Sequence, residues 1–169
     1  YMGKPFLKKI LVAINGTHSS VLAAMYGIIL AKQYQLKMKV VFVVDTATIK
    51  YLINFKFLVS DEKDAYKNDL KKDGQNYLDY VVNLARTKGV KIEPELREGS
   101  VSSEVITAAD EFGSDLILVG GHNDPGSYIQ GNQTKKSSAV TVRNEIVNYA
   151  HCPVLVVHKQ DVEELFKIS

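Results

Sequence analysis

Two apolar stretches decide the fold class: Asp115-Leu-Ile-Leu-Val-Gly120 and Cys152-Pro-Val-Leu-Val-Val157. Each is a short, continuous aliphatic run, which is typical of a strand buried on both faces of a parallel sheet. Between them lie the turn Gly121-His-Asn-Asp-Pro-Gly126, a polar segment and a helical pattern. This order of elements is a strand, a glycine turn, a loop, a helix and a second strand. Such an arrangement can hold an anionic group against the N–H donors at the start of the helix.

Three further stretches predict strands. Residues 10–14 (Ile-Leu-Val-Ala-Ile) and 40–44 (Val-Val-Phe-Val-Val) are again continuous apolar runs. Residues 90–98 instead alternate apolar and polar side chains, as a strand with one exposed face does. Pro94 indicates a sheet edge for that strand, because proline cannot donate a ladder hydrogen bond.

Apolar residues at helical spacing separate the strands. Thr17, Ser19 and Ser20 offer N-caps for a helix that ends near Gln33. Ser102 or Ser103 offers the cap of another, which Gly113 ends. Further helices are predicted over residues 61–88, with an apolar stripe of Leu70, Tyr77, Val81 and Leu84, over 140–150, and as an amphipathic tail over 161–168. Strands alternating with helices predict a parallel α/β sheet with right-handed crossovers.

Two segments break this regular pattern. Residues 46–60 are apolar and aromatic without a clear period, and we expect an irregular or partly helical, lid-like excursion there. Residues 121–138 are expected to form a long polar loop. The tail of residues 161–168 could dock on a partner subunit or on its own domain.

Composition limits the classes of partner. The 169 residues carry a net charge of only +2, which argues against a dedicated nucleic-acid surface. No apolar run reaches about 18 residues, so no membrane-spanning helix is expected, and the apolar run at 10–14 is too short for a secretory signal. The lone Cys152 has no internal partner for a disulfide, which fits a reducing cytoplasm. In its place before a buried strand it is expected to be a packed thiol.

Five motifs resemble, in order and spacing, those of the universal stress protein family. Lys9-Ile-Leu-Val-Ala-Ile-Asn-Gly16 is similar to its opening strand and turn, and Phe42-Val-Val-Asp45 to the end of its second strand. Glu98-Gly-Ser-Val-Ser-Ser-Glu-Val-Ile106 resembles the entry to its third helix. Asp115-Leu-Ile-Leu-Val-Gly-Gly-His122 and Ala150-His-Cys-Pro-Val-Leu-Val-Val157 resemble its most recognisable motifs. The resemblance spans about residues 6–158.

The resemblance implies an α/β fold with an open five-stranded parallel sheet, strand order 3-2-1-4-5 and helices on both faces. This is a Rossmann-like fold of the adenine nucleotide alpha hydrolase-like kind. We expect a single domain over residues 1–169, with a core of about 6–158 and a short tail of 159–169. Many family members dimerise through the last strand, so the resemblance implies a homodimer through Pro153–Val157. Such pairing would cover an apolar edge.

The resemblance also implies how this chain differs from ATP-binding members, which carry Gly-x-x-Gly-x9-Gly-Ser/Thr after the fourth strand. Gly120 occupies the first glycine position and Asn123 the second. The third glycine and the hydroxyl fall on Val140 and Thr141, or in an alternative alignment on residues 137–138. Two of the three glycines are therefore missing.

The physical cost differs between these two positions. Asparagine tolerates the left-handed backbone that a phosphate loop requires, whereas the β-branched Val140 is stiff and disfavours a positive φ. Lys135 and Lys136 add positive charge beside the helix start. Asn15 stands where ATP-binding members have an aspartate that contacts the nucleoside. The implied nucleotide-binding residues are Ala13, Ile14, Asn15 and Val43 for the nucleoside, and Gly120, Gly121, His122, Asn123, Ser137, Ser138 and Thr141 for the phosphates.

Our leading functional hypothesis is a cytoplasmic universal stress protein with a regulatory ligand. That ligand is ATP or another adenine nucleotide, with Mg²⁺ if it is a triphosphate, and hydrolysis would be slow at most. No nucleophile with a partnered base stands out, so no catalytic residue is assigned. The four histidines lack ligand spacing, so no metal site is predicted. The alternatives are a dimeric interaction module that binds no nucleotide, with segments 46–60 and 121–138 on a partner, and an enzyme acting on a small adenylated ligand.

Overall fold

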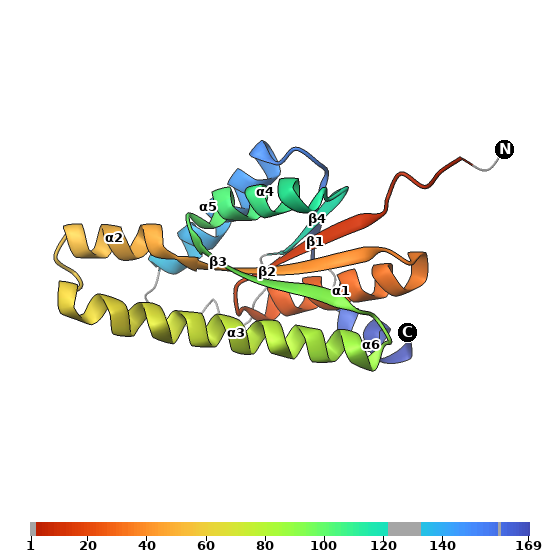
Figure 1. Cartoon of the computed structure of the whole chain (residues 1–169), viewed down its shortest axis with the longest axis horizontal. Helices are drawn as coiled ribbons and strands as arrows, with labels where there is room; N and C mark the ends of the chain where they lie inside the picture. Colours follow the sequence, from red (N-terminus) through yellow and green to blue (C-terminus); the bar gives the residue numbers. More distant parts are fainter. Residues whose placement is uncertain (1–2, 122–132, 159) are drawn as a thin grey trace.

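The computed structural model describes residues 3–121, 133–158 and 160–169, with the backbone alone over 133–139. Its strands are β1 Lys9–Ile14, β2 Lys37–Asp45, β3 Ile92–Gly99, β4 Leu116–Gly120 and β5 Val154–Val157. Its helices are α1 His18–Tyr34, α2 Thr46–Asn54, α3 Lys63–Thr87, α4 Val101–Phe112, α5 Gln133–Tyr149 and α6 Val162–Ile168, with the short 3-10 helix η1 Ser60–Glu62. The strands form one parallel sheet in the order β3-β2-β1-β4-β5, as the family resemblance implies (Figure 1).

Alternate residues of the central strands face two different helical layers. Ile10, Val12 and Ile14 of β1 pack with α1, α3 and α6, whereas Leu11 packs on the opposite side with α4 and α5. Figure 1 shows α4 and α5 on one side of the sheet, and α1, α3 and α6 on the other. Burial on both faces is the reason why these strands are apolar at every position.

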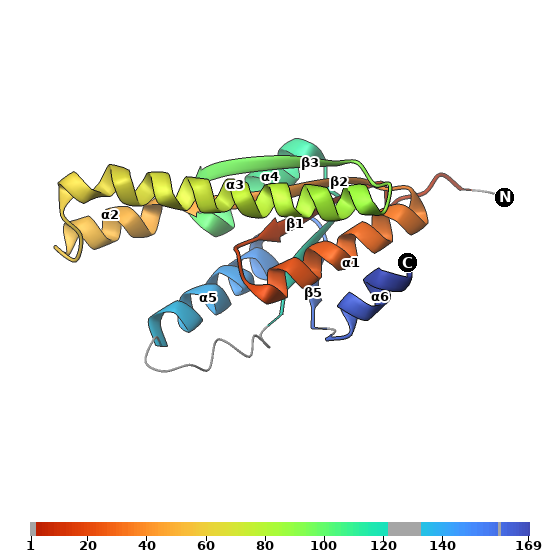
Figure 2. The ribbon, with the colours of Figure 1, turned by 90° about the horizontal axis from the view of Figure 1, so that it is seen from below.

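Helix α2 and the beginning of α3 extend beyond the sheet along the long axis of the molecule (Figures 1 and 2). Asp45 starts this extension, since its Oδ1 accepts a hydrogen bond from the Thr48 N–H at 3.0 Å as an N-cap. Ile49, only 2% exposed, anchors α2 to the rest of the fold. The partly helical excursion predicted over residues 46–60 is thus confirmed.

Helix α5 corrects one prediction. It begins at Gln133 rather than at Val140, so residues 133–138 are helical and not part of a loop. The segment from Gln133 to Ala139 contains neither glycine nor proline and is compatible with a helix throughout. The predicted start came from the family's usual spacing before Pro153, which does not hold for this chain.

Two finer predictions are also wrong. The N-cap of α4 is Ser100, and Ser102 lies inside the first turn, where its buried hydroxyl donates to a carboxylate oxygen of Glu145 in α5. In α3 the predicted stripe is confirmed for Val81, which is buried, and for Leu70 and Leu84, which pack against the core, but it is wrong for Tyr77, which is 37% exposed. The other buried residues of α3 are Gly74, Leu78 and Ala85. Gly74 is the cause of this difference, because a Cβ there would lie 2.6 Å from the Phe42 ring. Because Gly74 has no side chain, its face of α3 can pack closely against the sheet.

The C-terminal helix α6 packs on its own domain. Val162 and Phe166 are buried against the layer that contains α1. The Lys88 ammonium lies 4.7 Å from the centre of the Phe166 ring, and Lys32 Nζ donates to the Ser169 carbonyl at 2.8 Å. Of the two docking sites open for the tail, the structure shows the one on the same chain.

Candidate functional site

The sheet has a topological switch point between β1 and β4. From β1 the chain crosses to β2 on one side, while β4 and β5 lie on the other side. Ligands of open α/β sheets bind outside the carboxyl ends of the strands at such a point. In this chain those ends are Ile14 and Gly120, so we place the candidate site, called the β1/β4 edge below, around them.

A hydrogen-bonded turn connects β1 to the start of α1. Asn15 Oδ1 accepts hydrogen bonds from the Thr17 N–H at 3.1 Å and from the Thr17 hydroxyl at 2.6 Å. Ser20, which is 3% exposed, accepts from the Asn15 N–H at 3.2 Å and donates to the Thr17 carbonyl at 2.9 Å. Thr17 also caps α1 by accepting from the Ser20 N–H. The exposed Asn15 side chain is therefore oriented by its Oδ1, and its Nδ2 amide is a donor at this edge.

Gly120 permits a close backbone contact at the same edge. A Cβ on this residue would lie 2.7 Å from the Ser19 carbonyl carbon and 2.8 Å from the Ser20 nitrogen. The first turn of α1 thus rests directly on the end of β4. Because Ser20 also bonds Asn15, the structure brings Asn15 and Gly120 to one place, as the site prediction requires.

Gly121 has a packing role of its own. Its N–H donates to the Val157 carbonyl at 2.9 Å, and a Cβ would collide with the His158 ring and that carbonyl. Gly120, which occupies the first glycine position of the family's ATP-binding loop, and its neighbour Gly121 are thus both explained in this chain by contacts within the protein. That explanation does not prevent a ligand from approaching the same backbone.

The remaining nucleoside candidates lie on both faces of the sheet. Ala13 and Val43 pack with the α4/α5 layer, whereas Ile14 packs with α1 and α3. Val43 is buried, at 8% exposure, so it offers little surface in this conformation. The candidates therefore flank the sheet edge from both faces.

The phosphate candidates of the following segment are placed differently from the prediction. Thr141 lies in the third turn of α5, well after the first turn that carries the free N–H groups of a helix. Ser137 and Ser138 are likewise inside the helix and not at its start. His122 and Asn123 lie outside the described residues.

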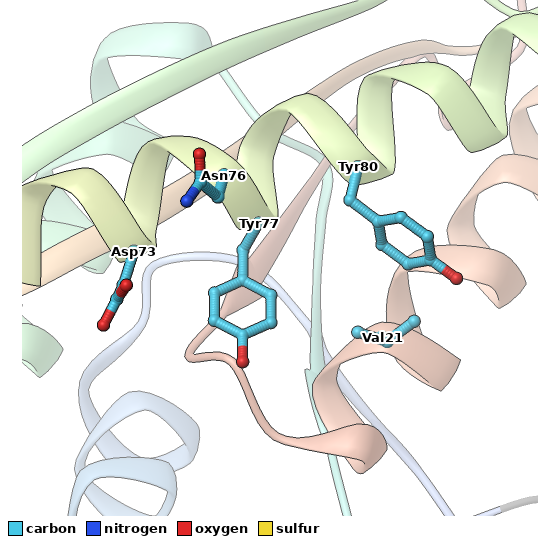
Figure 3. Close-up of a pocket in the computed structure, with 5 residues that line it drawn as sticks. All are labelled: Val21, Asp73, Asn76, Tyr77 and Tyr80. Atoms are coloured by element: carbon cyan, nitrogen blue, oxygen red, sulfur yellow. The ribbon is translucent and has the colours of Figure 1, made fainter.

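A groove of about 480 Å³ opens on the other face of the sheet, between α1 and α3. It is lined by Val21, Asp73, Asn76, Tyr77 and Tyr80 (Figure 3). Tyr77 forms the wall toward the candidate site, since its ring stacks on Phe42 and lies where a Cβ of Gly16 would be. The sequence prediction assigned Tyr77 to the core; the signal for a groove was the pair of tyrosines three residues apart on one helix.

The described residues bring no cluster of reactive groups together at the β1/β4 edge. Among residues 3–121, 133–158 and 160–169, no group of three or more His, Cys, Asp and Glu residues could hold a metal ion. Burial raises the pKa of the Cys152 thiol, and the nearby Asp110 and Asp115 raise it further, so the neutral form is favoured. His151 pairs with Asp110 at 2.9 Å, and His18 lies 3.4 Å from Glu163.

A dense cluster of charged side chains lies instead beside the β3 edge of the sheet. Arg97 contacts Glu95 at 2.7 Å, Glu104 at 2.8 Å and Glu111 at 3.0 Å. Burial alone would lower the pKa of Arg97, but the hydrogen bonds that its guanidinium donates to these three carboxylates raise it overall. Lys39 extends the cluster through Glu95 at 2.8 Å. Each charge has a partner, so the cluster is a structural network.

The sheet, its switch point and the capped start of α1 define a Rossmann-like α/β domain. Residues 7–158 match the model of the universal stress protein family, and the chain belongs to this family. None of its described helices has the length and apolar character needed to cross a membrane.

Individual relatives agree with this assignment. The universal stress protein MJ0531 of Methanocaldococcus jannaschii is 29% identical over 161 residues, covering 95% of this chain and 88% of its own. The universal stress protein YxiE of Bacillus subtilis is 29% identical over 151 residues, covering 88% and 97%.

Solved structures show the same fold at lower identity. A universal stress family protein from Burkholderia pseudomallei superimposes with a TM-score of 0.70 at 22% identity, over 93% of this chain and all (100%) of that chain. A family member from Arabidopsis thaliana, solved with AMP bound, has a TM-score of 0.61 at 18% identity over 91% and 94%. A universal stress protein from Archaeoglobus fulgidus in complex with dAMP has a TM-score of 0.57 at 15% identity over 90% and 98%.

Proposed function

We propose that this universal stress protein acts in the cytoplasm as a stress-response regulator that binds an adenine nucleotide at the β1/β4 edge. The observation that carries the proposal is the meeting of Asn15, the first turn of α1 and Gly120 through Ser20. The AMP and dAMP complexes of two family members support the choice of ligand class.

The charge pattern of the edge suits an anionic ligand. The first turn of α1 carries no acidic side chain, although that is where acidic residues are favourable in a helix. The positive end of the helix dipole at Thr17 and His18 is therefore not neutralised by the helix itself. A phosphate group near this turn would be stabilised by the dipole and by backbone donors.

The hydrogen-bond polarity of the site follows from Asn15. Its Oδ1 is used by Thr17, so the outward group is the Nδ2 donor. An aspartate at this position could use one oxygen in the same turn and present the other as an acceptor. We expect Asn15 to bond an acceptor atom of the nucleoside, such as a ring nitrogen or a ribose oxygen.

The length of the phosphate chain is also expected to matter. By the family resemblance, Asn123 stands at the second glycine position of the ATP-binding loop, and Val140 or, in the alternative alignment, residues 137–138 stand at the third. Helix α5 also begins earlier than the family spacing implies. Close backbone approach to a polyphosphate is therefore hindered. We propose that a nucleoside monophosphate binds at least as tightly as ATP, and that Mg²⁺ contributes only to triphosphate binding.

Titration calorimetry and thermal unfolding with AMP, ADP and ATP, each with and without Mg²⁺, test the proposal. A nucleotide at 100 times its Kd should stabilise the protein by about 2.7 kcal/mol. Asn15→Asp keeps an oxygen for the turn but reverses the outward polarity, so it should change the Kd. Asn83→Asp, the same change at an exposed asparagine of α3, is the matched control and should leave the Kd unchanged. Unchanged unfolding at millimolar concentrations of all three nucleotides would contradict the proposal.

We further propose that the functional unit is a homodimer through β5. This strand is at the edge of the sheet, and Val154, Leu155 and Val156 are each only half-buried within one chain. In a parallel sheet successive residues direct their N–H and C=O groups to opposite sides. Pro153 and Val157 bond β4 through their carbonyls, so the Val156 N–H is directed to the open edge.

Val156→Pro tests the dimer, because it removes an outward donor where an edge strand tolerates proline. We expect light scattering to give a dimer for the native chain and a monomer for the variant. Val147→Lys, which changes an exposed apolar residue of α5, is the control and should remain dimeric. A Val156→Pro variant that is still dimeric would exclude this interface.

One observation favours the alternative of an interaction module that binds no nucleotide. Tyr51, Phe55, Phe57 and Val59 are all largely exposed, which is costly unless they have a use. If no adenine nucleotide binds while the dimer is intact, this alternative becomes the preferred function.

A further inference from the structure

The groove between α1 and α3, called the α1/α3 groove below, has a wall of aromatic and polar side chains. Asp73, Asn76, Tyr77 and Tyr80 of α3 line it together with Val21 of α1. The four α3 positions have the spacing of one helix face. Figure 3 shows Asp73, Tyr77 and Tyr80 extending from the same side of α3, with Val21 close to Tyr80. The groove thus combines two phenol rings, an aliphatic side chain and a carboxylate.

The polar groups of this wall have no partner within the protein. In the part of the chain that the structure describes, the side chains of Asp73, Asn76 and Tyr80 form no hydrogen bond or ion pair, and neither does the Tyr77 hydroxyl. The Tyr77 ring itself is held in place, since it stacks on Phe42 with the ring centroids 6.3 Å apart. A fixed ring and four unused polar groups therefore face the same open space.

The charges of α3 around the groove favour a cation. Asp69, one turn before Asp73, adds a second carboxylate to the same face of the helix. Lys67 and Lys71 form ion pairs with a glutamate at the end of β3, away from the groove. Lys72 is next to Asp73 in sequence, but successive residues of a helix are about 100° apart around its axis. This face of α3 is therefore anionic.

Helix α1 does not neutralise that charge. It contains no aspartate or glutamate, and its only basic side chains are His18 and Lys32. His18 lies 3.4 Å from Glu163, and Lys32 donates to the Ser169 carbonyl at 2.8 Å, so both are directed to the C-terminal segment that contains α6. Among the described residues that line the groove, Asp73 is thus the only charged one, and it lacks a counter-ion.

We propose that the α1/α3 groove binds an organic cation in which an ammonium group is joined to an aromatic ring. The ammonium would lie at Asp73 and beside the Tyr77 ring, which attracts cations through its π electrons. The aromatic ring would lie against Tyr80 and Val21. Asp73 and Tyr80 are seven residues apart, or about 10 Å along a helix, which suits a ring with a short ammonium arm.

Two features support a ligand of this size and separate it from the nucleotide. The groove volume of about 480 Å³ is in the range of small-molecule sites. Tyr77 lies between the groove and the turn that carries Asn15, because its ring occupies the space of a Cβ on Gly16. The site therefore goes beyond the proposed function and does not require nucleotide binding.

An NMR titration of the full chain with three probes of similar shape tests the proposal. The probes are 2-phenylethylamine, which carries an ammonium, the neutral 2-phenylethanol and the anionic phenylacetate. We expect 2-phenylethylamine to shift the resonances of Val21, Tyr77 and Tyr80. It should bind about fivefold more tightly than the alcohol, which is the factor that an exposed ion pair can supply. Phenylacetate should bind most weakly of the three.

Two variants and two matched controls assign the binding to named side chains. Asp73→Asn should make the amine and the alcohol bind equally, and Tyr80→Leu should weaken the amine about threefold through the loss of a ring. Asp79→Asn on another face of α3, and Tyr34→Leu at the end of α1, should leave the Kd unchanged. All four variants should unfold like the native chain, because every altered side chain is exposed.

Three results would overturn the proposal. One is the absence of shifts in Val21, Tyr77 and Tyr80 at millimolar 2-phenylethylamine. Another is equal binding of the three probes, which would make the groove a general apolar surface. The third is an equal effect of Asp79→Asn and Asp73→Asn, which would assign the preference to the overall charge of α3.

Discussion

Replacing Gly120 by alanine should destabilise the unliganded protein, because the added Cβ has no space. The obstructing atoms belong to the backbone of Ser19 and Ser20, at 2.7 to 2.8 Å, and cannot move without displacing α1. The φ angle of Gly120 is not among the positive values found for glycine in this fold, so the penalty is steric and not conformational. Overpacking of this kind costs about 2–3 kcal/mol, which for a domain of this size corresponds to a decrease in Tm of about 4–12 °C.

A comparison with Gly74→Ala sharpens the test. There the added Cβ would lie 2.6 Å from the Phe42 ring, a side chain that can be shortened. Urea unfolding should show that Phe42→Leu relieves much of the cost of Gly74→Ala in a double-mutant cycle. No side-chain truncation at Ser19 should relieve Gly120→Ala. If Gly120→Ala unfolds at the native temperature, the contact with α1 is not what requires this glycine, and the ligand becomes its remaining explanation.

Three other perturbations test separate parts of the structure. Thr17→Ala removes the cap of α1 and should cost about 0.5–2 kcal/mol in urea unfolding; an unchanged midpoint would contradict the cap. The N–H groups of Lys8 and Lys9 lower the pKa of Asp115. The ionised Asp115 therefore stabilises the fold at pH values above its unfolded pKa, and this contribution is lost as the pH falls through its folded pKa. In Asp115→Asn the free energy of unfolding should depend less on pH in that range. Arg97→Met removes the cation that contacts Glu104 and Glu111, while Glu95 keeps Lys39, and should cost about 2–3 kcal/mol. Glu111→Gln, at the exposed end of the cluster, should cost under about 1 kcal/mol.

The strands could be predicted from sequence because burial on both faces imposes a local signal. Every position of residues 10–14 contacts one helical layer or the other, so the run is apolar throughout. Pro94 likewise placed β3 at the edge, where the structure has it. The order of the strands came from the family resemblance and is confirmed by the observed pairing.

The parts that were wrong depend on contacts between distant residues or on family spacing. Ser102 has the composition of a cap, but its hydroxyl is used by Glu145 of another helix. The start of α5 was inferred from the distance to Pro153, although the chain itself has no helix breaker from Gln133 to Ala139. The packing role of Gly120 depends on the path of α1, which no local pattern of the sequence contains.

The position of β1 at the centre of the sheet has a consequence for the order of folding. On one side β1 pairs with β2, which follows after a single helix. On the other side β1 pairs with β4, where Ile10 lies opposite Leu116, a residue most of the chain away in sequence. Bringing such distant segments together is entropically slow. We therefore expect the β1–β4 contact, with the Asp115 carboxylate accepting from the Lys8 and Lys9 amides, to form late. The edge proposed to hold the nucleotide would then be completed last, and a ligand present during refolding should mainly slow unfolding without accelerating folding.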